Sequence, residues 1–272
     1  EDMESMMYKG LMASLGDPYS AYYTSEEYEE LNTETTGSYK GIGVVMQMNM
    51  ESGTVKVVRC YETAPGAKAG LLPEDILVAV NNESIAGMEL SEVVDKIKAS
   101  EDEIAHLTIA RDGEADYLEF DIPLEEVNIP VVESEMLEDN IGYIALYEFT
   151  EQTEPQYMEA FKNLKKEGME RLIVDVRGNP GGLLTSVSDI LKDMLPEGLI
   201  VYTEDKDGKR EEIKCDGKHQ LDMPLAVLVN GNSASASEIF AGAIQDYEIG
   251  TIVGTTTFGK GIVQSVIPLS DG

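Results

Sequence analysis

An uninterrupted apolar run at residues 224–229 meets a turn and then a helical pattern, and this junction strongly constrains the fold. The run has the length and composition of a fully buried strand. The sequence Asn-Gly-Asn at residues 230–232 is a turn signal, and the helical pattern opens at Glu238 after three alternating serines. Such a junction can hold a hydroxyl at the positive end of a helix, where unpaired N–H groups stabilise an oxyanion. It is therefore suited to presenting a nucleophile.

A lysine flanked by glycines follows the next predicted strand. Residues 249–254 form a second apolar run, and Lys260 lies beyond it in the sequence Phe-Gly-Lys-Gly. Glycines let the backbone approach the lysine closely. The intervening helix and strand allow the serines and Lys260 to meet at one edge of a sheet. We therefore expect a serine nucleophile with unprotonated Lys260 as its general base.

Two observations favour a lysine base over a histidine. A Ser-His-Asp arrangement would need His106 or His219, and neither lies at the predicted edge. A free lysine has a pKa of about 10.4, and removal from water favours its neutral form. The apolar neighbours expected to remove Lys260 from water are Phe258, Ile262 and Val263.

The same stretch resembles the tail-specific, or carboxyl-terminal processing, serine peptidases. Their motif reads SASASE, then FGKG and a glutamine four residues after the lysine, as residues 233–238, 258–261 and Gln264 read here. The resemblance implies that Ser235 is the nucleophile, that Lys260 is the base and that Gln264 orients the lysine.

A glycine-rich turn, DVRGNPGG at residues 175–182, joins a buried strand to a helix. It lacks the GxGxxG and GxxxxGK[ST] patterns, which argues against a nucleotide site. The turn is similar to the family's DLRxNxGG segment, with Val176 in place of leucine. The resemblance implies one oxyanion donor at the N–H of Gly181 or Gly182, with Gly181 favoured, and a second at the N–H of Ala236.

Residues 37–125 resemble a PDZ domain. Such domains bind a peptide C-terminus by adding it as a strand between a sheet edge and a helix. The corresponding elements here are residues 42–48 and the amphipathic residues 90–99. The peptide carboxylate would meet a backbone nest formed by Gly41, Ile42, Gly43 and Val44, although the two glycines alone would also suit a plain hairpin turn.

The resemblance and the alternation of elements predict an α/β (mixed) fold. A PDZ-like, partly open β-barrel domain would be inserted before an α/β peptidase domain of the crotonase/ClpP-like type, after N-terminal helices. The expected boundaries are 1–36 for the helical segment, 37–125 for the PDZ domain and 126–272 for the peptidase core. The core should hold a mostly parallel sheet with helices on both faces, and residues 262–264 should form a short strand.

The family continues beyond Ser270-Asp271-Gly272 with further strands, so the C-terminal part of its domain is expected to be missing. Ahead of the PDZ-like region, a helix is expected at residues 2–16, followed by a GDPYS segment at residues 16–20 that has a counterpart in the family. Nearby tyrosines are expected to be packing surface rather than a ligand platform; they are Tyr19, Tyr22, Tyr23 and Tyr28.

Composition excludes several classes of partner. The formal net charge is −32, from 52 acidic and 20 basic residues, which argues against nucleic acid and anionic membrane surfaces. The two cysteines, Cys60 and Cys215, fall in different predicted domains, and metal-binding spacings are absent, so neither a disulfide framework nor a metal or other cofactor is expected. The resemblance implies an extracytoplasmic enzyme (periplasmic, cell-surface or secreted) whose export or anchor segment has been removed.

The sequence therefore predicts a serine endopeptidase that cleaves proteins near their C-termini. Its expected partners are protein or peptide substrates with free, apolar C-termini, and a homo-oligomer is left open. Movement of the PDZ domain is hypothesised to open or align the site. One alternative is a PDZ-type peptide-binding module on a non-catalytic peptidase scaffold. Another, an acyl-CoA enzyme of the crotonase type, is disfavoured because no basic patch is present for the CoA phosphates.

Overall fold

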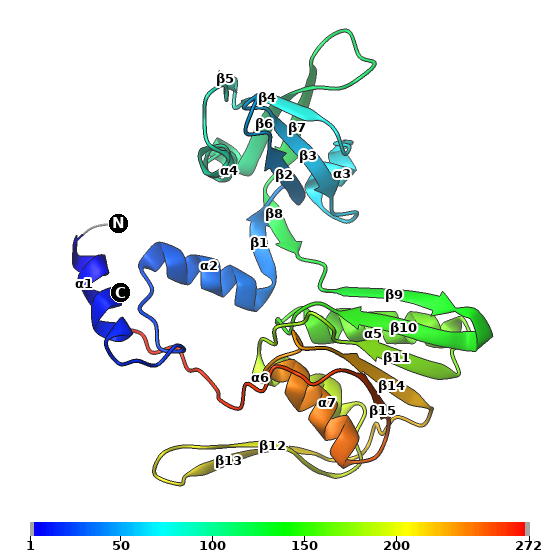
Figure 1. Ribbon diagram of the computed structural model, residues 1–272. Helices are drawn as coiled ribbons and strands as arrows, with labels where there is room; N and C mark the ends of the chain where they lie inside the picture. Colours follow the sequence, from blue (N-terminus) through cyan, green and yellow to red (C-terminus); the bar gives the residue numbers. More distant parts are fainter. Residues whose placement is uncertain (1–2, 270–272) are drawn as a thin grey trace. The chain divides into compact units, whose positions relative to one another are not determined.

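The computed structural model describes residues 3–269 and divides into two compact units (Figure 1). The small unit is Ser38–Ile129, and the large unit combines the N-terminal segment up to Gly37 with the chain from Pro130 onward. The N-terminal helices therefore belong with the sheet that carries the serine and lysine segments. None of the described helices is both long and apolar enough to cross a lipid bilayer.

An antiparallel sheet and one amphipathic helix build the small unit. The sheet order is β2-β3-β4-β6-β7, with β5 paired to β4, and β1 pairs separately with β8. Helix α4 buries Val93 and Ile97 against the sheet. The elements are β1 (Ser38–Gly41), β2 (Val44–Met48), β3 (Val55–Cys60), α3 (Pro65–Ala69), β4 (Ile76–Val80), β5 (Glu83–Ser84), α4 (Leu90–Lys98), the 3-10 turn Glu101–Glu103, β6 (Ile104–Ala110), β7 (Leu118–Pro123) and β8 (Glu125–Asn128).

The large unit is organised around a five-stranded sheet of order β15-β14-β11-β10-β9. Its four strands from β10 to β15 run parallel, and β9 is an antiparallel edge. The mostly parallel sheet was expected. The elements are α1 (Met3–Ala13), α2 (Ser25–Thr36), β9 (Val132–Leu137), the 3-10 turn Glu138–Asn140, β10 (Ile141–Leu146), α5 (Thr153–Lys166), β11 (Arg171–Asp175), α6 (Leu184–Lys192), the hairpin β12 (Gly198–Glu204) and β13 (Arg210–Cys215), β14 (Leu225–Val229), α7 (Ala236–Asp246) and β15 (Thr251–Gly254).

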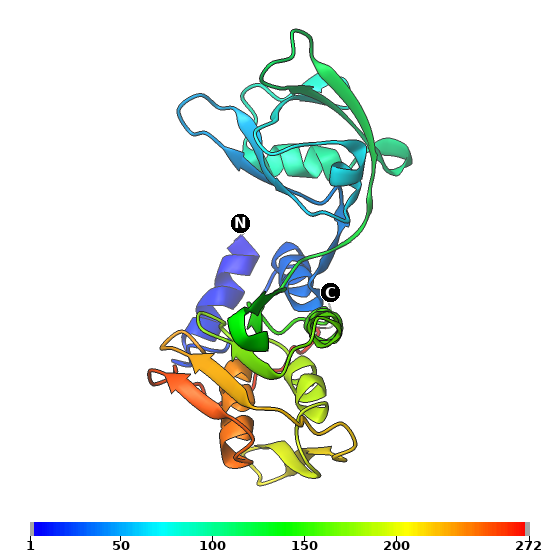
Figure 2. The ribbon, with the colours of Figure 1, turned by 90° about the vertical axis from the view of Figure 1, so that its right-hand side faces the viewer.

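Helices α5, α6 and α7 pack on one face of this sheet, not on both faces as the sequence predicted (Figure 2). The strands alternate in burial, so Ile144, Val174 and Val227 share the helix-covered core. Residues that point to the opposite face of the sheet, such as Tyr143 and Val253, stay partly or largely exposed. The apolar runs read as continuous, but only alternate residues enter the core.

The predicted strand at residues 262–264 is absent. Residues 261–269 are described, and none of them pairs into a sheet. Their large apolar side chains remain exposed; they are Ile262, Val263, Val266, Ile267 and Leu269. The expectation about Ser270-Asp271-Gly272 lies outside the described residues.

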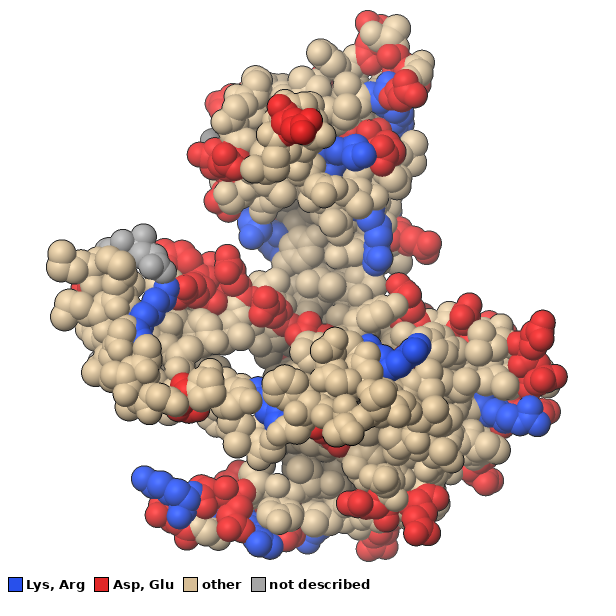
Figure 3. All heavy atoms as spheres, in the orientation of Figure 1, with Lys and Arg blue, Asp and Glu red and all other residues tan. Residues whose placement is uncertain are grey.

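Charge is distributed rather than concentrated on the face shown in Figure 3. Acidic side chains are spread over both units there, and lysines and arginines lie among them without forming one basic patch. This agrees with the composition argument against a polyanionic partner.

One buried ion pair fixes the small unit. Asp75 is 1% exposed, and its carboxylate accepts hydrogen bonds from Arg111 Nε at 2.7 Å and from Leu72 N at 2.8 Å. Arg111 also donates to Gly70 O at 2.8 Å, so the pair joins β6 to the turn before β4. A buried charge that is fully paired holds its surroundings in one arrangement.

We predict that Arg111→Met lowers the free energy of unfolding of the small unit by about 3 kcal/mol, because it leaves the Asp75 charge buried and unpaired. Native-state hydrogen exchange of the β6 amides measures this energy. Lys56→Met is the control, since the Lys56–Glu74 ion pair is largely exposed and should contribute little. Equal effects of the two substitutions would contradict the assignment.

Candidate active site

Ser235 lies at the junction that the sequence singled out, between the turn after β14 and the start of α7. Its backbone has φ 53° and ψ −114°, a conformation that non-glycine residues rarely adopt. Such strain costs of order 1–3 kcal/mol and persists only where the surroundings impose it. The sharp turn presents Ser235 as the N-cap of α7, half-buried at the positive end of the helix.

The structure distinguishes the three serines of the motif. Ser233 is fully buried, and its hydroxyl donates to Val176 O at 2.7 Å and accepts from Asn230 N at 3.0 Å. Ser237 is also fully buried and donates to Asn179 O at 3.0 Å. Ser235 makes no such bond to the glycine-rich loop, and its side chain instead faces the N–H of Glu238 in the capping box at the start of α7. The flanking serines therefore attach the junction to the glycine-rich loop, and the middle serine lies at the start of α7.

The glycine-rich loop touches Ser235 directly. A Cβ added at Gly181 would lie 2.7 Å from Ser235 Cβ and 2.8 Å from Ala234 O, and Gly181 has φ +111°. Only glycine allows this approach. The fully buried Asn179 sets the loop, because its Nδ2 donates to Leu146 O at 2.9 Å and its Oδ1 accepts from Gly181 N at 2.8 Å.

The bond from Gly181 N to Asn179 Oδ1 affects which N–H groups could serve as the expected oxyanion donors. The N–H of Gly181 points to Asn179 Oδ1 and is not available to a substrate in this arrangement. In the described part of the chain, the N–H groups of Gly182 and Ala236 have no hydrogen-bond partner. The choice between the two glycines therefore moves from Gly181, which the sequence favoured, to Gly182.

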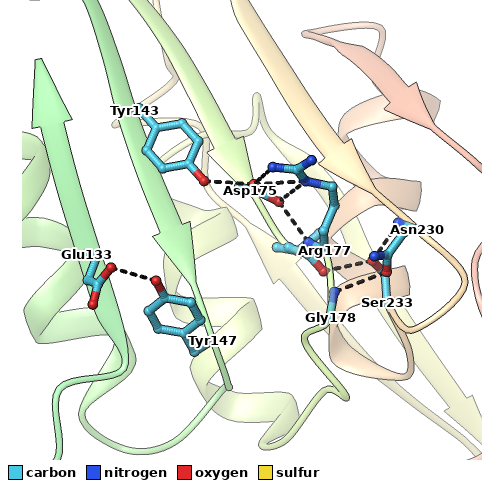
Figure 4. Close-up of polar contacts among 9 residues, drawn as sticks. Glu133, Tyr143, Tyr147, Asp175, Arg177, Gly178, Asn230 and Ser233 are labelled. Carbon is cyan, nitrogen blue, oxygen red and sulfur yellow. Dashed lines mark hydrogen bonds and ion pairs between the residues drawn. The ribbon is translucent and has the colours of Figure 1, made fainter. Parts of the chain in front are cut away.

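The other end of the loop is anchored by charge (Figure 4). Arg177 Nε donates to both oxygens of Asp175 at 3.0 and 2.9 Å, and the Tyr143 hydroxyl donates to Asp175 at 2.7 Å. Burial alone would raise the pKa of the Asp175 carboxyl, but the bonds from Arg177 and Tyr143 outweigh it and lower the pKa. Gly178 N donates to Asn230 Oδ1 at 3.0 Å, which ties the loop to the turn before Ser235.

The side chains of Lys260 and Gln264 lie together. Lys260 Nζ donates to Gln264 Oε1 at 2.7 Å, and Gln264 Nε2 donates to the carbonyl oxygen of Tyr19 at 2.9 Å. In a straight strand, residues four apart would stand about 13 Å apart, so the lack of strand pairing here lets the side chains meet. Lys260 Nζ also lies 4.9 Å from the centre of the Tyr19 ring.

Two expectations for Lys260 are not met in this arrangement. No hydrogen bond joins Ser235 Oγ to Lys260 Nζ, although both residues are described. The apolar neighbours expected to shield the lysine from water are themselves exposed, by 60% at Phe258, 46% at Ile262 and 57% at Val263. They face solvent because residues 261–269 pair with no strand.

Glu238 links the serine to the lysine segment, and sequence reasoning missed it. Its Oε2 accepts from Ser235 N at 2.9 Å and from Lys260 N at 2.8 Å. Its Oε1 accepts from Gly259 N at 2.6 Å and from the Thr257 hydroxyl at 2.8 Å. The spacing of Ser235 and Glu238 is that of a capping box, which could have identified this carboxylate.

Hydrogen bonding makes Glu238 acidic. Burial alone would raise the pKa of its carboxyl, but bonds from one hydroxyl and three backbone N–H groups outweigh burial and lower the pKa below its ordinary 4.5. A lowered folded-state pKa stabilises the fold above the unfolded value, and this stabilisation is lost as the pH falls through the folded value. The charge of Glu238 therefore contributes at neutral pH and not in strong acid.

The predicted peptide-binding residues lie where β1 leads into β2. Ile42 is buried, with its carbonyl accepting from Gly66 N at 2.8 Å, and Gly43 has φ +71°. A Cβ at Gly43 would lie 2.1 Å from Ala64 Cβ, so this glycine is required by packing. Gly41 ends β1 and Val44 begins β2.

No cluster of histidine, cysteine or acidic side chains within residues 3–269 is arranged to hold a metal ion.

We predict that Glu238→Gln lowers the free energy of unfolding at pH 7 by about 1–2 kcal/mol, because an amide accepts these bonds less well than a carboxylate. The difference between wild type and variant should shrink below pH 4.5, the ordinary value, and be lost once the pH falls below the lowered pKa of the folded wild-type carboxyl. Chemical denaturation at several pH values measures this difference in stability. The control is Glu159→Gln, which changes an exposed carboxylate on α5. A difference that does not change with pH would contradict this role.

Comparison with known proteins agrees with this geometry. Residues 140–272 match peptidase family S41, and residues 56–111 match a PDZ domain. The carboxy-terminal processing protease CtpB of Bacillus subtilis is 34% identical over 97% of this chain and 55% of its own length. The carboxyl-terminal-processing protease of Synechocystis is 34% identical over 96% of this chain and 62% of its own. This chain thus spans little more than half of these relatives.

A solved structure is also similar to this chain, and the chain covers a larger share of that protein than of the two relatives above. The structure titled photosystem II D1 C-terminal processing protease is 30% identical, with a TM-score of 0.55, over all of this chain and 75% of the other. Together with the serine, lysine and glutamine in the expected motifs, these matches show that the chain belongs to peptidase family S41, the carboxy-terminal processing proteases.

Proposed function

We propose that this chain carries the catalytic dyad of a serine endopeptidase that cleaves proteins near their C-termini, with Ser235 as nucleophile and Lys260 as base. One observation carries the proposal. Among the three serines of the motif, only Ser235 combines a strained N-cap backbone with a half-buried side chain, whereas Ser233 and Ser237 are fully buried and bonded to the glycine-rich loop. Glu238 ties the backbone of this serine to that of Lys260.

Completion of the dyad requires only a side-chain movement. The backbone N–H groups of Ser235 and Lys260 share one carboxylate oxygen, so the two residues start from neighbouring, fixed positions. The lysine side chain is a flexible stem of four carbons. Rotation of that stem would bring Nζ to Ser235 Oγ, and substrate binding would exclude water from the pair.

The proposed reaction proceeds through an acyl-enzyme. Neutral Lys260 takes the proton of the Ser235 hydroxyl, and the oxygen attacks the peptide carbonyl. The N–H groups of Gly182 and Ala236 donate to the developing oxyanion at the N-terminus of α7. The lysine ammonium then gives its proton to the leaving amine, and water releases the acyl group by the reverse route. No cofactor is needed for these steps.

The small unit supplies the substrate preference in this proposal. A peptide C-terminus would add along β2, with its carboxylate at the backbone of residues 41–44. Val44, Met46 and Met48 are half-buried and pack against the core, which suits a tail with apolar side chains. Methionine adapts its shape to varied apolar partners.

We predict that a fluorophosphonate probe labels Ser235 of the wild-type chain and that Ser235→Ala abolishes labelling. Lys260→Ala should slow labelling at least ~10³-fold, because the hydroxyl loses its base. Lys218→Ala, which removes an exposed, ion-paired lysine, is the matched control and should label like wild type. Mass spectrometry of the labelled peptide measures the rate. A wild-type chain that never labels would instead favour a PDZ-type binding module on a peptidase scaffold.

We predict that the small unit recognises a free carboxylate. A peptide ending in apolar residues should bind the Ser235→Ala chain about 10–100-fold more tightly than the same peptide with an amidated C-terminus, because charge-assisted hydrogen bonds are lost. Fluorescence anisotropy measures both affinities. A peptide with a lysine as its last residue is the control for the apolar preference. Equal affinity for acid and amide would refute tail recognition.

A further inference from the structure

A turn far away in the chain lies against the lysine of the candidate dyad. Tyr19 belongs to residues 17–20, ahead of α2, and it makes two contacts with the lysine segment. Its carbonyl oxygen accepts from Gln264 Nε2 at 2.9 Å, and its ring lies 4.9 Å below Lys260 Nζ. Since Nζ also donates to Gln264 Oε1 at 2.7 Å, the three residues form a closed set of contacts.

We propose that Tyr19 is a positioning residue for the base: its carbonyl fixes the amide of Gln264, and its ring faces the ammonium of Lys260. The proposal rests on the function proposed above for Lys260. It differs from the packing surface that the sequence predicted for Tyr19. It also gives the N-terminal segment a part in the reaction.

The turn has its own means of holding this position. Asp17 Oδ1 accepts from Tyr19 N at 3.2 Å, and Asp17 Oδ2 accepts from the Ser20 hydroxyl at 2.6 Å. These two bonds lower the pKa of the Asp17 carboxyl, with the Ser20 bond as the larger cause. An aspartate that bonds its own backbone two residues on defines an Asx-type turn. Tyr19 is therefore presented by local bonding, independently of the sheet.

Both contacts address a weakness of lysine as a base. A lysine stem is flexible, and the apolar neighbours of Lys260 are themselves exposed. Gln264 uses both ends of its amide, one for Nζ and one for the Tyr19 carbonyl, so its orientation is determined. The ring face attracts a cation. It therefore stabilises the ammonium that forms when Lys260 takes the proton of Ser235, which is when stabilisation speeds the reaction.

The test compares substitutions that separate the ring from the rest of the residue. Tyr19→Leu removes the aromatic face but keeps the backbone carbonyl, and Tyr19→Phe keeps both. We expect Tyr19→Leu to lower kcat and the rate of fluorophosphonate labelling about tenfold, equivalent to ~1.4 kcal/mol. KM should stay within about twofold, and Tyr19→Phe should restore wild-type values. Tyr22→Leu, whose ring packs on Tyr8 at 5.0 Å, is the matched control.

A double-variant cycle tests whether Tyr19 acts through the lysine. In the Lys260→Ala background, Tyr19→Leu should cause no further loss, because the group on which the ring acts is gone. Additive losses would overturn the proposal, as would a Tyr19→Leu chain that labels at the wild-type rate. Should Tyr19→Leu lower the melting temperature, Tyr19→Met fills more of the ring's space without a π face and gives the same comparison.

A second measurement does not depend on activity. Competitive acetylation with acetic anhydride, read by mass spectrometry, reports how readily Lys260 reacts relative to the other lysines. We expect Tyr19→Leu to raise the acetylation rate of Lys260 severalfold while leaving that of Lys218 unchanged. An unchanged Lys260 rate would refute the contact. If the wild-type chain is not labelled by fluorophosphonate, the proposed dyad fails, and this measurement still decides whether Tyr19 shields the lysine.

Discussion

The carboxylate of Glu238 is the interaction on which the candidate site depends. It accepts bonds from the backbones of Ser235, Gly259 and Lys260, so one ionised group joins the start of α7 to the segment that follows β15. Bonds to an ionised acceptor are about twice as strong as neutral ones. Its bonds to this segment end at Lys260, and residues 261–269 beyond it pair with no strand. Without this carboxylate, the lysine segment would keep few anchors near the serine.

The candidate site also depends on the close approach of the glycine-rich loop to the backbone around Ser235. Gly181 touches Ser235 and Ala234 where a side chain cannot fit, and Asn179 holds that glycine by its amide. The buried hydroxyls of Ser233 and Ser237 complete the junction by bonding to the carbonyls of Val176 and Asn179. The alternation of serines is thus explained by geometry. Two of them join neighbouring loops, and the strained turn holds the third, the half-buried Ser235, at the start of α7.

The local features of this site could be predicted from sequence, and the long-range ones could not. Apolar runs bounded by turns predicted the parallel strands β11 and β14, because burial of a strand leaves a local signal. The same runs predicted helices on both faces wrongly, since an apolar residue on the open face reads like one in the core. The contact between Tyr19 and Gln264 joins residues 245 positions apart, and no periodicity reports such a pair.

The contacts around Lys260 explain how the site can hold its parts while the dyad is open. The backbones of Ser235 and Lys260 share one carboxylate, yet the lysine Nζ bonds to Gln264 and faces Tyr19. In the proposed dyad, movement of the flexible lysine side chain would bring Nζ to the serine. Because the ring favours the cation, it would stabilise the ammonium formed when Lys260 takes a proton, and exclusion of water by a substrate would favour the neutral amine that takes it.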